Sequence, residues 1–196
     1  MFYSKFNPQT TYVISDTHFG HKNLVSGTTT WVDKRNCREF STIEEHDSVV
    51  LDSLMINGAE TLIHLGDFIF GDKTKLPNVV AQLRKHYSKI ILLYGNHDIV
   101  IRKDYKAEFD WTGDYLEFRT GKKLWCAQHF PLLSWTDSAR GSYCLGGHEH
   151  GNLNHLDFVK NSRWLDMGWD VWKRPVNLAE LGEILREKPI RSLGHH

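Results

Sequence analysis

The ten residues KIILLYGNHD, at positions 89–98, carry an unbroken apolar run that stops at Gly95, Asn96 and His97. A short apolar run bounded by turn residues is typical of a strand that is buried on both faces. The same arrangement occurs in four other segments: TYVISDTH at 11–18, TLIHLGD at 61–67, KLWCAQHFP at 123–131 and SYCLGGHEH at 142–150. We therefore expect five strands, each followed directly by polar side chains.

Helical periodicity is found in three segments, at residues 40–58, 76–88 and 177–188. In the first, Ser41 and Glu44 match a capping box, and in the third Asn177 is expected to cap the helix. Strands alternate with helices early in the chain and follow one another later. This order indicates an α/β fold with α+β character in its second half. In open sheets of this kind the ligand site lies beyond the carboxyl ends of the strands.

The composition is that of an ordinary globular protein, with 40% hydrophobic and 24% charged residues among 196, so we expect a single domain over residues 1–192. The closing residues 193–196, LGHH, resemble the remnant of a purification tag. A formal net charge of zero gives no general signal for nucleic acid or an anionic membrane as a partner.

Three cysteines with no CxxC motif fit a reducing compartment, and no run of residues reaches the length of a signal peptide core or a membrane span. A cytoplasmic protein is the expectation.

The strand ends bring together donors that suit a transition metal. They are Asp16, His18, Asp67, Asn96, His129, His148 and His150. Carboxylate, amide and imidazole groups in one set favour Mn, Fe, Zn, Ni or Co. Any one of these residues could simply be a turn residue or a packed histidine. Their recurrence at five strand ends favours a shared site, and two ions roughly 3.5–4 Å apart would form a clamp for displacement at phosphorus.

These motifs, DTH at 16–18, GD at 66–67, GNHD at 95–98, His129 and GHEH at 147–150, resemble those of the calcineurin-like metallophosphoesterase superfamily. The tail around Met167 is similar to that of small bacterial and phage members. The resemblance implies an αββα sandwich with mixed sheets and a dinuclear metal site at the carboxyl ends of the strands.

The resemblance also implies a role for each residue. One divalent ion would be held by Asp16, His18, Asp67 and His150, and the other by Asp67, Asn96, His129 and His148. Asp67 would bridge the two ions, and a water or hydroxide between them would be the nucleophile. His97 would not be a ligand; it would donate a proton to the leaving oxygen or stabilise the charge of the transition state. Mn is the expected metal, with Fe, Ni, Co or Zn as alternatives.

The sequence departs from one branch of that superfamily at Phe70. Serine/threonine protein phosphatases have there an aspartate that orients the catalytic histidine, so the resemblance argues against that branch. What orients His97 is left open. Asp98 is one candidate, although stabilising its own turn is the more common role for such a residue.

Several residues beside these motifs are candidates for substrate contacts. His21 and Lys22 follow the first motif, and Arg35 or Arg38 could grip a phosphate in a bidentate manner. A solvated loop is the alternative interpretation for each of them. His46 falls in the helix expected at residues 40–58 and is assigned to its surface or flank.

The expected function is therefore that of a metal-dependent phosphoesterase acting on a small or nucleotide-like phosphodiester or phosphomonoester. A diester is slightly favoured, because no additional basic cluster is evident that could hold a dianionic phosphate. Two alternatives stay open at this point. One is a catalytically silent metal-binding scaffold, and the other is a nuclease acting on DNA or RNA ends. The sequence contains no pattern that fixes the oligomeric state.

Overall fold

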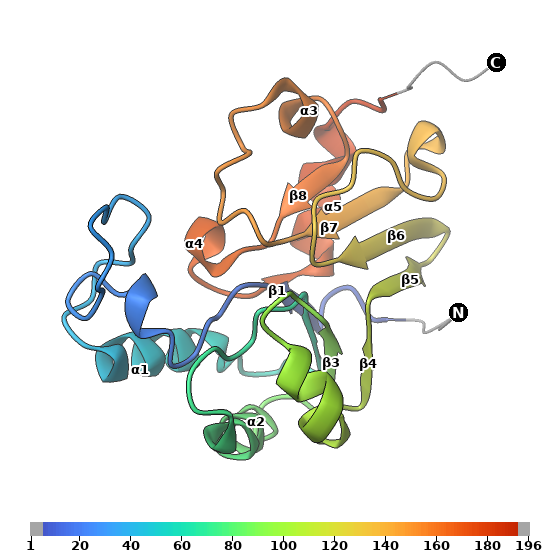
Figure 1. Ribbon diagram of the computed structural model, residues 1–196. Coiled ribbons are helices and arrows are strands. Elements are labelled where there is room, and N and C mark those ends of the chain that lie inside the picture. Colours follow the sequence, from blue (N-terminus) through green and yellow to red (C-terminus); the bar gives the residue numbers. More distant parts are fainter. Residues whose placement is uncertain (1–5, 192–196) are drawn as a thin grey trace.

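Two sheets stacked face to face form the centre of the molecule in the computed structural model, which describes residues 6–191 (Figure 1). Residues 193–196, interpreted above as a tag remnant, lie outside the described residues. The first sheet has the order β4-β3-β2-β1-β9 and the second the order β5-β6-β7-β8. This arrangement is the αββα sandwich with mixed sheets that the family resemblance implies.

The first sheet consists of β1 (Thr11–Ile14), β2 (Thr61–His64), β3 (Lys89–Leu93), β4 (Trp111–Gly113) and β9 (Val176–Asn177). Strands β1 to β4 are parallel, and only β9 is antiparallel to its neighbour. The second sheet consists of β5 (Tyr115–Thr120), β6 (Lys123–Gln128), β7 (Tyr143–Gly146) and β8 (Trp164–Asp166). Here β5 and β6 are antiparallel, whereas β6, β7 and β8 are parallel.

The longer helices are α1 (Ile43–Leu54), α2 (Leu76–Leu83) and α5 (Leu178–Glu187), and α3 (Asp157–Lys160) and α4 (Trp169–Trp172) are single turns. Short 3-10 turns lie at η1 (Lys22–Leu24), η2 (Lys73–Lys75), η4 (Lys106–Glu108) and η5 (Ser138–Arg140), and η3 (Ile101–Tyr105) is a π-turn. No helix in the described part of the chain is long and apolar enough to cross a membrane.

Alternation along each strand builds two separate cores, because successive side chains point to opposite faces of a sheet. Val13 of β1 packs into the core between the sheets, and its neighbour Ile14 packs into the core beneath α1 and α2. In Figure 1 these two helices cover the face of the first sheet that is turned away from the second. Helix α5 contributes Leu181 and Leu185 to the core between the sheets.

The outer layer over the second sheet is thin. Cys126 and Trp164 face away from the first sheet and are covered by Val159 of α3 and by side chains of loops. The cysteine and the tryptophan are nonetheless fully buried. The second helical layer of the sandwich is therefore reduced to one turn and its flanking loops.

The expected helix caps were right at α5 and wrong by one residue at α1. The Asn177 side chain accepts a hydrogen bond of 2.8 Å from the Glu180 N–H, as expected. At α1 the cap is Thr42 instead of Ser41, because Thr42 is the last extended residue and its hydroxyl accepts from the Glu45 N–H at 3.1 Å. Glu45, and not Glu44, closes the motif by accepting from the Ser41 N–H at 2.8 Å.

Candidate metal centre

Two groups of donors lie where β1, β2, β6 and β7 end. Asp16, His18 and His150 form one group, and Asp67, His129 and His148 form the other. Within each group the potential ligand atoms all lie within 4.8 Å of one another. Parallel strands place their carboxyl ends at one edge of a sheet, and both sheets contribute here. The structure thus brings together in space residues that lie far apart in the sequence.

Asp67 lies between the two groups. Its Oδ2 atom is 3.6 Å from His18 Nε2 on one side and 3.5 Å from His129 Nε2 on the other. The Asp67 side chain is 2% exposed. A single carboxylate oxygen therefore faces both sets of imidazoles in a nearly dry environment.

The imidazole of His129 is oriented by a backbone carbonyl. Its Nδ1 lies 2.9 Å from the Leu65 oxygen, so this nitrogen donates and Nε2 keeps its lone pair. Nε2 faces Asn96 Oδ1 at 3.1 Å and His148 Nδ1 at 3.2 Å. Asn96, expected as a ligand from the sequence, therefore lies beside the second group.

His150 is oriented by a carboxylate that the sequence analysis did not identify. Its Nδ1 donates to Asp170 Oδ2 at 2.6 Å, so in the neutral imidazole Nε2 carries the lone pair, and this atom lies 3.3 Å from His18 Nε2. Outer carboxylates of this kind fix the tautomer of metal-binding histidines. Burial opposes a charge on His150, but the Asp170 bond and the Asp16 carboxylate raise its pKa.

Arg38 is a structural residue of this centre and not a free phosphate ligand, which corrects the expectation from sequence. It is 4% exposed. Its guanidinium binds both Asp170 oxygens at 2.9 and 2.7 Å, the backbone oxygens of Asp16 and Thr17 at 2.6 and 2.9 Å, and His46 Nε2 at 2.8 Å. All five N–H groups are thereby used.

The structure also places His46 and Arg35. His46 was assigned to a helix surface but is fully buried, and its Nδ1 atom lies 2.8 Å from Asp47 Oδ1. Arg35, the alternative phosphate contact, is highly exposed and pairs with its neighbour Asp33 at 2.6 Å.

Five candidate ligands have left-handed backbone conformations, with φ between 51° and 74°: Asp16, His18, Asp67, His148 and His150. Each such residue costs roughly 1–2 kcal/mol relative to the right-handed region. Strain of this kind concentrates at functional sites. Neighbouring glycines allow the tight loops, because a Cβ on Gly95 would overlap Asp67 Oδ1 and a Cβ on Gly147 would overlap Ser15 Oγ.

The buried polar atoms of the centre fit a cation. Asp16 is fully buried and its Oδ1 has no hydrogen-bond partner among the described residues. Burial, together with the nearby Asp67 and Asp166 carboxylates, raises the pKa of Asp16 to about 7, despite the opposing effect of His150. Burial lowers the pKa of His18 well below its usual range. Carboxylates that repel one another beside neutral imidazoles are stabilised by divalent cations.

His97 lies at the open side of the centre. Its side chain is 35% exposed, and Nε2 is 3.9 Å from Asp67 Oδ2. Its backbone N–H donates to Asp67 Oδ1 at 3.0 Å. The Phe70 ring meets the His97 ring edge-on at 4.8 Å, so an aromatic contact occupies the place of the absent aspartate.

Asp98 holds two loops together. It accepts hydrogen bonds from the backbone N–H groups of Gly95 and Asp67 at 2.8 Å and of Phe68 at 3.1 Å. The turn-stabilising role expected for it is therefore observed, and it extends to the loop that carries Asp67.

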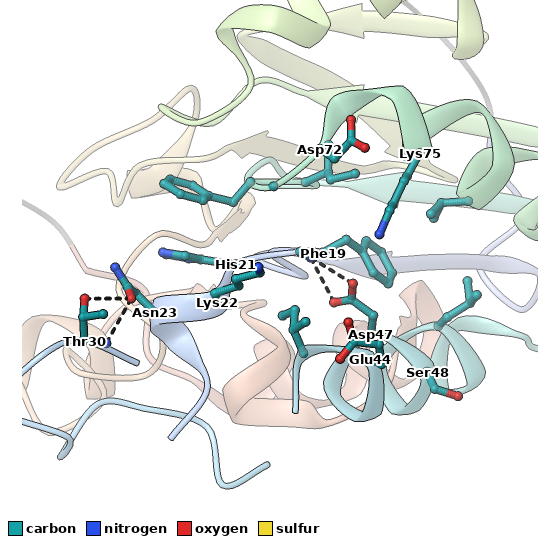
Figure 2. Close-up of a pocket in the computed structure, with 17 residues that line it drawn as sticks. Phe19, His21, Lys22, Asn23, Thr30, Glu44, Asp47, Ser48, Asp72 and Lys75 are labelled. Carbon is teal, nitrogen blue, oxygen red and sulfur yellow. Dashed lines mark hydrogen bonds between the residues drawn. The ribbon is translucent and has the colours of Figure 1, made fainter. Parts of the chain in front are cut away.

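His21 and Lys22 lie where the centre opens into a pocket of about 880 Å³ (Figure 2). The His21 ring is buried and stacks on Phe70 with ring centroids 3.9 Å apart. It lies 5.4 Å from the His18 ring. Lys22 is exposed and lines the same pocket. Both residues are thus near the donor groups without belonging to them.

Sequence reasoning missed Asp166 and Asp170. Asp166 accepts from the N–H groups of Gly151 and Gly168 at 2.8 Å and so connects the His150 loop to the segment before α4. A usable signal existed, because residues 164–172, WLDMGWDVW, place two carboxylates in an apolar segment. A buried carboxylate requires a partner, and unassigned strand-end histidines were available.

Comparison with known proteins agrees with this geometry. A family model described as calcineurin-like phosphoesterase matches residues 10–196. The uncharacterized protein MJ1445 of Methanocaldococcus jannaschii is 29% identical over 182 residues, which span 91% of this chain and 85% of that protein. The crystal structure of AQ665, a protein of unknown function from Aquifex aeolicus, superposes with a TM-score of 0.66 at 22% identity, covering 89% of this chain and 98% of that one. This superposition shows that the two chains share a fold. On the strength of the family match, the chain belongs to the calcineurin-like phosphoesterase family.

Proposed function

We propose that the chain is a hydrolase that uses two divalent cations to cleave phosphoesters. Asp16, His18, Asp67 and His150 would hold one cation, and Asp67, Asn96, His129 and His148 the other. The observation that carries the proposal is the position of Asp67 Oδ2, 3.6 and 3.5 Å from imidazoles of the two donor groups. Family membership supports metal-dependent phosphoester hydrolysis in general.

The cations would supply Lewis acidity and a hydroxide nucleophile at neutral pH. The mixture of oxygen and nitrogen donors favours Mn²⁺, with Fe, Ni, Co and Zn as alternatives. The chain supplies the fixed positions of these donors. Asp170 and the Leu65 carbonyl each bind the Nδ1 of a histidine and so direct the opposite nitrogen toward the centre.

His97 would donate a proton to the leaving oxygen of the substrate. It is partly exposed, close to both donor groups and held by its backbone bond to Asp67. Its ring is packed against Phe70, which restricts the directions in which Nε2 can point. A positioned acid of this kind contributes about 10²–10⁴-fold to a rate.

A phosphodiester is the favoured substrate. A terminal phosphate carries a second negative charge, for which an arginine is the usual partner. Arg38 is the buried guanidinium nearest the first donor group in the described structure, and all of its donors are used. The zero net charge gives no support to extended nucleic-acid binding.

The test is hydrolysis of bis-p-nitrophenyl phosphate and p-nitrophenyl phosphate by metal-stripped protein. Mn²⁺, Ni²⁺, Co²⁺, Zn²⁺ and Mg²⁺ are added back singly, and metal content is measured in parallel. We expect cleavage with a transition metal, faster for the diester. His97→Ala should keep both cations and lose roughly 10²-fold or more in turnover. No cleavage by protein with two bound cations would refute the proposal and favour the metal-binding scaffold.

Two other expectations stay predictions. Cys37, Cys126 and Cys144 are free thiols, in keeping with a reducing compartment such as the cytoplasm. The proposed partner is a small phosphoester. Cleavage of oligonucleotides that falls steeply with salt would instead favour the nuclease alternative.

A further inference from the structure

The pocket beside the metal centre lies between α1 and the segment that leads into α2. Ile43, Asp47 and Leu51 line it from α1, and Asp72, Lys75 and Val79 line it from the opposite side. Figure 2 shows Lys75 extending toward the wall that carries Asp47 and Glu44. The pocket has a volume of about 880 Å³, which falls within the roughly 300–1,000 Å³ that is usual for small-molecule pockets.

The pocket reaches the centre on the side of His97. Phe70 and His21, which both line the pocket, have ring centroids 4.8 and 6.2 Å from that of His97. Phe70 is 41% exposed; His21 stacks on its ring with centroids 3.9 Å apart, and Lys73 Nζ lies 5.5 Å from the ring centroid, so the ring offers its exposed edge to the pocket. A group whose oxygen receives the proton of His97 would therefore extend over Phe70 into this pocket.

The lining excludes a polyanion and favours a neutral group. Glu44, Asp47 and Asp72 are opposed by only Lys22 and Lys75 among the charged lining residues. The described residues provide no ion-pair partner for Glu44, so its carboxylate is available as an acceptor. A second phosphate would meet more carboxylates than ammonium groups.

Apolar side chains form another part of the wall, beside the polar Asn23, Thr30 and Ser48. Phe19, Leu51, Ile69 and Val79 come from the loop after β1, from α1, from the loop after β2 and from α2, and line the same space. Small-molecule sites combine such apolar walls with a few polar groups that fix orientation. The combination suits a flat ring with N–H or O–H donors along its edge.

We propose that this pocket binds the leaving group of the substrate, and that this group is a nucleoside. The inference rests on the proposed phosphoesterase function and adds its substrate class. A base would pack against the exposed edge of Phe70, and its amine or imino hydrogens would meet Glu44, because the Asp47 carboxylate already accepts from the Gly20 N–H and faces His46 Nδ1. A substrate of this kind is a nucleoside phosphodiester with one phosphate at the metal centre and an uncharged nucleoside in the pocket.

The experiment uses free adenosine and guanosine as probes, with ribose as the control compound. Each is tested as an inhibitor of bis-p-nitrophenyl phosphate hydrolysis and by calorimetric titration of the Mn²⁺-loaded protein. A nucleoside should raise KM for the aryl diester without changing kcat, and ribose should not. Direct binding is measured separately, so it reports on the pocket even without turnover.

Ser48→Trp fills the pocket from α1, and Val49→Trp is its matched control. Ser48 lines the pocket, whereas Val49 is the next residue on the same helix, exposed and outside the lining. We expect Ser48→Trp to weaken nucleoside binding roughly tenfold or more, which is about 1.4 kcal/mol, while Val49→Trp binds like the unmodified protein. Thermal unfolding and metal content show that both variants fold.

The outcomes separate the two proposals. Aryl diester hydrolysis without nucleoside competition or binding overturns the nucleoside assignment and leaves the phosphoesterase intact. Equal nucleoside binding by the Ser48 and Val49 variants overturns the location of the site. Absence of any hydrolysis with two bound cations overturns the proposed function, and with it the leaving-group role.

Discussion

Replacing Asp170 by asparagine tests whether the carboxylate behind His150 determines metal affinity. Asp170 Oδ2 accepts from His150 Nδ1 at 2.6 Å and from an Arg38 terminal nitrogen at 2.7 Å, and Oδ1 accepts from Arg38 Nε at 2.9 Å. An asparagine keeps one oxygen. If the amide NH₂ takes the Oδ2 position, the hydrogen bonds from His150 Nδ1 and from the Arg38 terminal nitrogen are lost, and the NH₂ group faces these donors. If it takes the Oδ1 position, only the hydrogen bond from Arg38 Nε is lost.

The size of the expected loss in stability follows from the burial of Arg38 and Asp170. The side chains of Arg38 and Asp170 are 2% and 18% exposed, so removing the carboxylate leaves the guanidinium without its counter-charge in a nearly dry environment. Breaking a buried pair in this way costs about 3–5 kcal/mol. Loss of an outer partner of a metal-binding histidine costs roughly 10–100-fold in metal affinity. Asp170→Asn should show both effects.

The assay is calorimetric Mn²⁺ titration combined with urea unfolding of the metal-free protein. Lys173→Met is the control, since Lys173 Nζ lies 3.7 Å from Asp170 Oδ1 at the exposed end of the network. A surface pair contributes only about 0–1 kcal/mol, so this variant should bind metal normally. Unchanged Mn²⁺ affinity in Asp170→Asn would show that His150 does not depend on its partner, and the reasoning would fail.

Further predictions concern three other residues. Asp67→Asn should reduce the metal content from two ions per chain, because the proposed bridge loses its charge; elemental analysis showing two ions would remove Asp67 from that role. Arg38→Lys keeps the charge but replaces five bonded N–H groups by three, and losing two hydrogen bonds of a charged group at about 1.5–3 kcal/mol each should lower the urea-unfolding free energy by roughly 3–6 kcal/mol; a loss below 1 kcal/mol, about the value of a surface pair, would contradict the network. The folded metal-free protein retains the Asp16 proton from about pH 4 to about pH 7, whereas the unfolded chain releases it near pH 3.8. The folded state therefore binds more protons in this window, and stability falls as pH rises through it. Thermal melts in a chelator should show this fall in the unmodified protein and a smaller one in Asp16→Asn; equal slopes would contradict it.

The two donor groups could be predicted from the sequence, because each of their residues lies in a short motif next to a strand. Each of the five apolar runs forms a strand, and each polar cluster begins within a few residues of the strand end. An apolar run followed by a Gly-Asp or Gly-Asn turn specifies both the strand and the place where it stops. Parallel pairing then brings residues such as Asp16 and Asp67 together without further information.

The hydrogen bonds that join Arg38, Asp170 and His46 could not be predicted in this way, because they depend on contacts between segments that are distant in the sequence. Arg38 lies in a segment rich in charged residues that reads as a solvated loop, and its burial depends on Asp170. Four of the nine strands in the described part of the chain were not among the five expected. Strand β5 was missed although its six residues alternate in burial, and the short strands β4, β8 and β9 were missed because two or three residues carry no periodicity of their own. Such strands form only because a neighbouring strand edge is available to them.

The pairing of Arg38 with Asp170 has a consequence for how the protein is made. The two residues are 132 positions apart, so at about 5–20 residues per second a ribosome needs roughly 7–26 s to progress from one to the other. During this interval the nascent chain already contains the Asp16 and His18 donors, while His150 is added only near the end of it and the carboxylate that orients His150 comes last. A complete cation site exists only after the last of these residues has been synthesised and the two sheets have assembled. We therefore expect the cation to be selected by the finished fold, from the ions that the surrounding compartment offers at that moment.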